Sequence, residues 1–227
     1  MGLIYFIRHA ESIVNVTREF SHKLVDKSLT KKGKKQASQL ADYLKEIEFT
    51  NLFSSPMKRA YETSRYISKK KNLPIQVIEE IREVNVGDLE KSPPSEEAWN
   101  QYFEIARSWY QGTPERRFPN GENMHELVKR FYTGVKRILE TSSGEPSVLI
   151  GHGGIFITGL AEVLTNIDRR FFYDNRWLNC GISTVELTLN EETLSGKLIQ
   201  FGDISFLKGE ASDQDYPLPN QNKKKNI

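Results

Sequence analysis

The sequence predicts an α/β protein, built as a three-layer α/β/α sandwich around a mainly parallel central sheet. Short apolar segments of strand length alternate with longer segments in which apolar residues recur with the period of a helix, from residue 3 to about residue 164. Strands that alternate with helices favour a parallel sheet with both faces covered. The 227 residues suit one domain, which we place at residues 1–207. Residues 208–227 are polar, and we expect them to form a disordered tail.

The first half of the chain contributes three predicted strands and two helices. The strands are expected at residues 3–7, 51–54 and 75–78. Thr30 suits the N-cap of a helix whose apolar residues recur every three or four positions. Ser55 and Pro56 predict a second helix, from Pro56 to about Lys70, because proline is favoured at the first helical position.

Residues 91–123 interrupt this alternation. A proline-rich breaker at residues 92–95 precedes an aromatic-rich helix at residues 96–110 and a polar loop at residues 112–121. We interpret the segment as an insertion over the edge of the sheet. The remaining elements are predicted helices at residues 124–139 and 155–164, a strand at 147–150, and a hairpin of residues 183–189 and 197–201.

Composition restricts the possible partners. Lys and Arg number 32 against 30 Asp and Glu, so the net charge of +2 gives no general case for a nucleic-acid or membrane partner. No apolar run approaches the roughly 20 residues that span a bilayer, and the N-terminus lacks the charged and then apolar segments of a signal peptide. The single cysteine, Cys180, fits a reducing compartment, so we expect a cytoplasmic protein. Four histidines without ligand spacing predict no metal site.

Basic and imidazole side chains follow the predicted strands at their carboxyl ends. Arg8 and His9 come directly after the first strand, and His152 follows a later one. Ligands of such sheets bind at the carboxyl ends of the strands, so these distant residues can share one site. Arg59, in the first turns of a helix, adds a second guanidinium, and this combination suits a phosphate dianion. Glu83 supplies a carboxyl group close to the same edge of the predicted sheet.

Several motifs occur in a fixed order along the chain. They are Arg8-His9-Ala10-Glu11-Ser12 with Asn15, residues 29–37, residues 53–63, Glu83 with Gly87, residues 119–122, and residues 148–154, with Asn179 as a looser match. In this order and spacing they resemble the histidine phosphatase superfamily, the phosphoglycerate mutase-like proteins. The resemblance implies the fold of that family, with the helical insertion lying over the active site, and no cofactor.

The resemblance also implies a mechanism. His9 would be the nucleophile and would form a phosphohistidine, which splits one displacement into two easier steps. Arg8, Arg59 and His152 would bind the phosphoryl oxygens. Glu83 would act as general acid toward the leaving alcohol and then as base toward water, so burial or the charge of the phosphate must favour its protonated form. His9 must attack as a neutral imidazole, whose tautomer a neighbouring acceptor fixes.

Other residues are second-rank candidates. By the same resemblance, Asn15 and the backbone N–H of Gly153 are additional candidates for phosphate binding. Glu90 is a rival candidate for the general acid. His22 and His125 match no motif, and we expect both at the surface.

The segment that follows Glu83, the predicted general acid, bears on whether the protein is a phosphatase or a mutase. Residues 87–91 lack the tryptophan and second glycine common in the family, and the chain also lacks the Tyr-Gly-rich segment of true mutases. We therefore expect metal-independent hydrolysis of small phosphomonoesters. The alternatives are a phosphoglycerate mutase and a regulatory protein that binds phosphate without turnover. A nucleotide-binding module is disfavoured, because no glycine-rich loop follows the first strand.

The insertion has two open interpretations. Its basic pair, Arg116 and Arg117, either binds a second acidic group of the substrate or is solvated. Its aromatic residues either wall an organic leaving group or pack the insertion onto the sheet. These aromatic residues are Trp99, Tyr102, Phe103, Trp109 and Tyr110.

Overall fold

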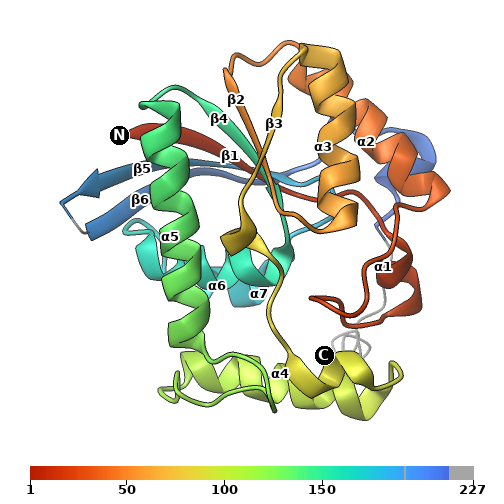
Figure 1. The fold of residues 1–227 in the computed structure, drawn as a ribbon, viewed down its shortest axis with the longest axis vertical. Coiled ribbons are helices and arrows are strands. Elements are labelled where there is room, and N and C mark those ends of the chain that lie inside the picture. The colour runs from red at the N-terminus through yellow and green to blue at the C-terminus, as the bar shows by residue number, and fades with distance from the viewer. Residues whose placement is uncertain (192, 215–227) are drawn as a thin grey trace, which may run out of the picture.

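The computed structural model describes residues 1–191 and 193–214. Its centre is a six-stranded sheet of order β3-β2-β4-β1-β5-β6, with helices on both faces (Figure 1). The strands are β1 (Gly2–Arg8), β2 (Asn51–Ser54), β3 (Ile75–Val77), β4 (Ser147–Gly151), β5 (Ile182–Asn190) and β6 (Thr193–Asp203). The α-helices are α1 (Ile13–Thr17), α2 (Lys31–Leu44), α3 (Lys58–Lys71), α4 (Glu96–Tyr110), α5 (Met124–Ser142), α6 (Gly153–Val163) and α7 (Phe171–Asp174). Three short 3-10 helices in the same part of the chain are η1 (Glu79–Ile81), η2 (Gly87–Lys91) and η3 (Gly209–Ser212). None of these described helices combines the length and apolar character needed to cross a membrane.

Pairing between the strands makes the sheet mainly parallel, as predicted. β1 pairs in parallel with β4, β4 with β2, and β2 with β3, whereas β5 runs antiparallel to both β1 and β6. The predicted α/β fold is therefore confirmed. The register of β1 and β4 places Arg8 opposite Gly151, so the residues that follow these two strands emerge side by side.

Alternate residues of β1 pack into two hydrophobic cores, which is why helices are needed on both faces of the sheet. Ile4 and Phe6 belong to the core under α5 and α6, whereas Ile7 belongs to the core under α2 and α3. The ring of Phe6 contacts those of Phe131 and Phe156 at centroid distances of 6.2 and 5.2 Å. Because side chains on both faces of β1 are buried, the position of its carboxyl end is fixed.

Two helices begin at residues other than the predicted ones, and both differences bear on the candidate site. α3 begins at Lys58 rather than at Pro56, because Met57 keeps an extended backbone and is the N-cap. α6 begins at Gly153 rather than at residue 155, with His152 as its N-cap. Gly153 and Gly154, which lie before the predicted start, thus form part of the first turn of α6.

The predicted boundary of the tail is too early. Residues Gly209–Ser212 form η3, in which Ala211 is buried and its carbonyl accepts a hydrogen bond from Nε2 of Gln36 at 3.0 Å. An apolar side chain and a buried amide therefore hold η3 on α2, so a disordered tail does not start at residue 208. Residues 215–227 of the predicted tail lie outside the described residues.

The insertion forms α4 over the predicted residues 96–110. In Figure 1, α4 lies at the bottom of the molecule, near the lower end of α5. Ile105 and Trp109 are buried in the core, and Nε1 of Trp99 donates to the carbonyl of Arg18 at 3.0 Å. The insertion is thus packed onto the loop that follows α1.

Candidate active site

His9 and His152 meet at the carboxyl ends of β1 and β4. The backbone N–H of His9 donates to the carbonyl of Gly151 at 3.0 Å, which continues the pairing of the two strands. The imidazole rings lie with their centroids 5.2 Å apart, and both side chains are buried. Two residues far apart in the sequence therefore share one site, as the strand-end argument predicts.

The surroundings of His9 select one tautomer. Its Nδ1 lies 2.7 Å from the carbonyl oxygen of Ala10, which can only accept, so Nδ1 carries the proton and Nε2 carries the lone pair. Nε2 accepts a hydrogen bond from Nε of Arg59 at 3.0 Å. Burial, followed by the positive charges of Arg59 and Arg8, holds the pKa of His9 well below its ordinary value of 6.5. The imidazole is therefore neutral at physiological pH.

Arg59 is held in place by the loop that follows α1. It lies in the first turn of α3 and is buried, with Nη1 donating to Oγ of Ser21 at 2.7 Å and Nη2 to the Ser21 carbonyl at 3.3 Å. Burial lowers the pKa of Arg59 to about 10, so the guanidinium stays charged at neutral pH. Ser21 has no motif around it in the sequence, and sequence reasoning missed it.

Arg8 lies beside the first turn of α6. Its Nη1 donates to the carbonyl of Trp177 at 2.7 Å. A Cβ added at Gly153 would lie 3.7 Å from Nε of Arg8, so the backbone of Gly153 runs along this side chain. The described structure thus brings both residues to the N-terminus of a helix, where backbone N–H groups favour an anion.

His152 presents an unpartnered nitrogen to this site. Its Nε2 lies 2.8 Å from Oγ of Ser55, whereas its buried Nδ1 has no hydrogen-bond partner within the described residues. If the Ser55 hydroxyl donates to Nε2, Nδ1 carries the proton and can donate to a phosphoryl oxygen. Burial, followed by the positive charge of Arg59 and by electrostatic coupling to His9, holds the pKa of His152 well below 6.5. The Ser55 hydroxyl also accepts from the backbone N–H of Met57 at 3.3 Å, so one side chain connects the start of α3 with this histidine.

The carboxyl group of Glu83 occupies the same helix end. Oε1 accepts from the backbone N–H groups of Val84 and Ile155, each at 3.0 Å, and Oε2 accepts from that of Gly154 at 3.3 Å. Glu83 is half-buried. These donors suit a carboxylate, the form needed to accept a proton from water.

A second layer of contacts fixes the segment that carries Glu83. Arg130 and Glu122 form a bidentate ion pair, in which Nη2 of Arg130 donates to Oε1 of Glu122 at 2.7 Å and Nε donates to Oε2 at 2.9 Å. Arg130 also donates to the carbonyls of Glu80, Arg82 and Glu83 at 2.8, 2.7 and 3.0 Å. Glu122 lies in a motif that the resemblance marked, but only the fold shows its partner.

Asn179 fixes the backbone of the proposed nucleophile. Its Nδ2 donates to the carbonyl of His9 at 2.7 Å, and its side chain is fully buried. Asn15, by contrast, uses its Oδ1 to accept from the backbone N–H of Ser12 at 2.9 Å, at the start of α1. A phosphate contact from Asn15 stays a prediction.

One expectation about the other titratable residues needs correction. His22 is buried rather than at the surface, because its Nδ1 lies 2.8 Å from the carbonyl of Glu83. Glu90 lies against another part of the chain, because its buried carboxylate accepts from the backbone N–H groups of residues 22–25, whereas that of Glu83 lies at the N-terminus of α6, next to Gly154. His125 is exposed, as expected.

The side chains of the insertion favour packing over substrate binding. Arg116 pairs with Glu104 at 2.8 Å and Arg117 with Glu126 at 2.8 Å, so both guanidiniums have surface partners. The aromatic rings contact one another and neighbouring rings, in stacked, tilted and edge-to-face arrangements. The pairs include Phe20 with Trp99 at a centroid distance of 4.4 Å, Tyr102 with Phe118 at 5.4 Å and Trp109 with Phe118 at 5.5 Å.

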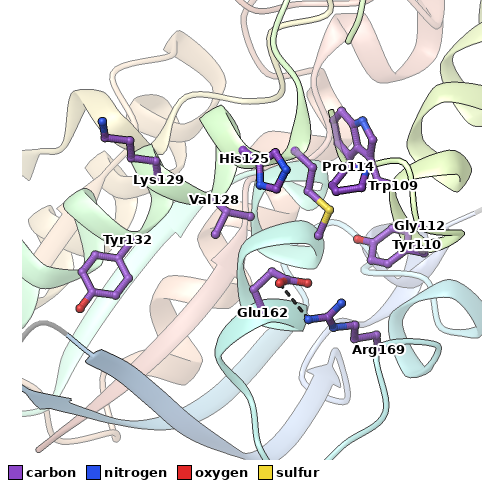
Figure 2. A pocket seen from close by; sticks show the side chains of 11 residues that line it. Trp109, Tyr110, Gly112, Pro114, His125, Val128, Lys129, Tyr132, Glu162 and Arg169 are labelled. Carbon is purple, nitrogen blue, oxygen red and sulfur yellow. Dashed lines mark hydrogen bonds and ion pairs between the residues drawn. The ribbon is translucent and has the colours of Figure 1, made fainter. Parts of the chain in front are cut away.

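A separate cavity of about 550 Å³ lies among α4, α5 and α6. Figure 2 shows Trp109 and Tyr110 on one side of it and the ion pair of Glu162 and Arg169 at its base, with 3.0 Å between the charged atoms. Its lining contains none of the five candidate catalytic residues. This cavity is therefore not the site built around His9.

The described residues also bear on metal binding. Within residues 1–191 and 193–214, no group of three or more His, Cys, Asp or Glu side chains is placed to hold a metal ion. The charges available to neutralise a phosphate at this site are the guanidiniums of Arg8 and Arg59.

A family model and two named relatives each match most of this chain. The family model described as the histidine phosphatase superfamily (branch 1) matches residues 4–197. A protein of Escherichia fergusonii named "Probable phosphoglycerate mutase GpmB" is 30% identical over 220 residues, which cover 93% of this chain and 97% of that protein. A protein of the same name from Salmonella arizonae is 29% identical with the same coverage.

Solved structures agree on the fold. A mycobacterial glucosyl-3-phosphoglycerate phosphatase is 19% identical with a TM-score of 0.73, and the match covers 88% of this chain and 98% of that one. A mutant phosphoserine phosphatase from Entamoeba histolytica, solved with phosphoserine, is 22% identical with a TM-score of 0.72, covering 92% of this chain and 100% of that one. Likeness at this level of identity establishes a shared architecture.

Proposed function

The chain belongs to the histidine phosphatase superfamily, and on this premise we propose that it is a metal-independent phosphomonoesterase that hydrolyses small phosphorylated metabolites through His9. One observation carries the proposal. The contact between Nδ1 of His9 and the carbonyl of Ala10 leaves Nε2 with a lone pair that faces Arg59 at 3.0 Å. A buried, neutral imidazole oriented in this way is suited to attack phosphorus.

The first step would transfer the phosphoryl group to the enzyme. Nε2 of His9 forms the bond to phosphorus while the bond from phosphorus to the leaving oxygen breaks, and protonated Glu83 gives its proton to that oxygen. Arg8, Arg59 and Nδ1–H of His152 stabilise the charge on the phosphoryl oxygens. The incoming phosphate places negative charge beside the Glu83 carboxyl group, and like charges favour its protonated form.

The second step would return the enzyme to its starting state. Glu83, now a carboxylate, takes a proton from a water molecule whose oxygen attacks phosphorus. The bond between Nε2 and phosphorus breaks, the electron pair returns to His9, and inorganic phosphate leaves. The hydrogen bonds that Glu83 accepts from α6 support its role as the carboxylate in this step.

A phosphoglycerate mutase is the second candidate function. The name carried by the relatives at 29–30% identity favours it. The residues after the acid favour hydrolysis, because residues 87–91 lack the segment typical of true mutases. The two functions share the first step and differ in whether water or a second hydroxyl accepts the phosphoryl group.

An assay with a chromogenic aryl phosphate and excess chelator tests the proposal. We expect turnover that resists the chelator and that is lost in His9→Ala, with circular dichroism as the check that the variant is folded. Equal turnover in the variant, or turnover only without chelator, would reject the proposed mechanism. A panel of 3-phosphoglycerate, sugar phosphates and nucleotides then separates phosphate release from isomer exchange.

A further inference from the structure

Glu90 holds an irregular loop through its carboxylate. The 20–25 loop, residues 20–25, contains no helix or strand. Oε1 of Glu90 accepts from the backbone N–H groups of four consecutive residues of this loop, and Oε2 adds a further contact. The distances to Oε1 are 2.6 Å from His22, 2.9 Å from Lys23, 2.9 Å from Leu24 and 2.9 Å from Val25. Successive N–H groups arranged around one anion form a nest, which a neutral side chain would fill poorly.

The 20–25 loop leads directly to the proposed phosphate-binding arginine. The hydroxyl of Ser21 donates to the carbonyl of Val25, within the loop that Glu90 holds. The same hydroxyl accepts from Nη1 of Arg59 at 2.7 Å, and Nε of Arg59 donates to His9 at 3.0 Å. An unbroken series of contacts therefore joins Glu90 to the proposed nucleophile without Glu90 touching it.

The same loop also contacts the segment of the proposed acid. Nδ1 of His22 lies 2.8 Å from the carbonyl of Glu83, and Nη1 of Arg82 donates to the carbonyl of His22 at 3.4 Å. Movement of the 20–25 loop would therefore disturb Arg59 and Glu83 together.

Glu90 is itself fixed to the core. It lies in η2, where Leu89 is buried, and the turn into η2 depends on Gly87, whose φ is +55°. A Cβ at Gly87 would lie 2.0 Å from the carbonyl oxygen of Pro119, so only glycine fits there. The carboxylate is thus a fixed point against which the 20–25 loop is ordered.

We propose that Glu90 is a positioning residue, whose carboxylate orders the 20–25 loop so that Ser21 keeps Arg59 in its phosphate-binding position against His9. The inference rests on the proposed function and adds a residue to it. Loss of the carboxylate should loosen the loop and weaken phosphate binding, because Ser21 would no longer hold the guanidinium of Arg59 in one position.

Binding of inorganic phosphate, measured by calorimetry, tests this without relying on turnover. We expect Glu90→Gln and Ser21→Ala each to raise the phosphate Kd about tenfold, and the double variant to bind no more weakly than either single variant, because both act through one loop. The matched control is Asp88→Asn in the same 3-10 helix, whose carboxylate pairs with Lys91 at the surface. This control should bind phosphate as the wild type does.

Other outcomes would overturn the proposal. Unchanged phosphate affinity in a folded Glu90→Gln protein, well below its melting temperature, would show that Glu90 contributes only to stability. Additive effects in the double variant would contradict a shared path through Ser21. Should Glu90→Gln fail to fold, Glu90→Asp and Ser21→Ala carry the test, and wild-type affinity in both would reject it. A wild type that binds phosphate without hydrolysis would reject the proposed function alone, whereas one that binds no phosphate would reject both.

Discussion

Nε of Arg59 donates a hydrogen bond to Nε2 of His9 across 3.0 Å. The contact couples the proposed phosphate-binding guanidinium to the proposed nucleophile, because a positive charge beside the ring disfavours its protonation. A phosphoryl oxygen that binds here competes for the same N–H. The lone pair of His9 would therefore be released as the guanidinium engages the substrate.

Replacement of Arg59 by lysine should be severely damaging. An ammonium cannot make the separate contacts that Arg59 makes with His9 and Ser21. We expect Arg59→Lys to lower kcat/KM roughly 100- to 1000-fold on an aryl phosphate, the magnitude found when a transition-state donor is removed. Arg65→Lys, at an exposed position of the same helix, is the control and should stay within about twofold of wild type. Similar losses in both variants would contradict the role of Arg59.

The pH dependence of kcat/KM should show a displaced acidic limb. Burial and then Arg59 and Arg8 lower the pKa of His9, so the imidazole keeps its lone pair until the pH falls well below 6.5. Activity that depends on neutral His9 should therefore persist at pH 6, and be lost only at lower pH. NMR titration of the imidazole C–H resonances separates the histidine from the ionisation of the substrate. A resonance of His9 that titrates near 6.5 would contradict this prediction.

The effect of Glu83→Gln should depend on the leaving group. A nitrophenolate departs with little protonation, whereas an alkoxide needs the proton of an acid. We expect a loss of about tenfold for nitrophenyl phosphate and roughly 100- to 1000-fold for an alkyl phosphate in kcat/KM for the first step. Equal losses on the two substrates would argue that Glu83 acts only through its contacts with α6.

The candidate site residues at the ends of strands could be predicted from the sequence. Short apolar runs mark the strands, and ligands of such sheets bind at the carboxyl ends of the strands. Arg8, His9 and His152 were placed in this way, and the order β4 next to β1 brings them together. The stripe of α2 was likewise visible as a periodic pattern, and the extent of α4 followed from the proline-rich breaker before an aromatic-rich segment.

The acceptors and supports of the site could not be predicted. The tautomer of His9 depends on a backbone carbonyl, at Ala10, and a carbonyl carries no information about residue type. His22 and Glu90 meet across 68 residues, in a loop without periodicity, so nothing local marked either residue as buried. The mistaken expectation for His22 followed from this lack of a local signal.

The ion pair of Arg130 and Glu122 should contribute to both stability and catalysis. Its side chains are only 20% and 8% exposed, so removal of the arginine leaves Glu122 with an uncompensated charge next to the Glu83 segment. We expect Arg130→Met to lower the free energy of unfolding by about 3 kcal/mol, the low end of the range for breaking a buried pair.

The pair of Arg117 and Glu126 has a similar N–O distance of 2.8 Å but is 52% and 50% exposed, which makes Arg117→Met the matched control. Its cost should be below about 1 kcal/mol, because solvent screens an exposed pair. Urea denaturation measures both variants, and kcat at a temperature where both are folded should fall only for Arg130→Met, since only that arginine holds the carbonyls around Glu83. Equal destabilisation of the two variants would contradict the argument that burial decides the value of these pairs.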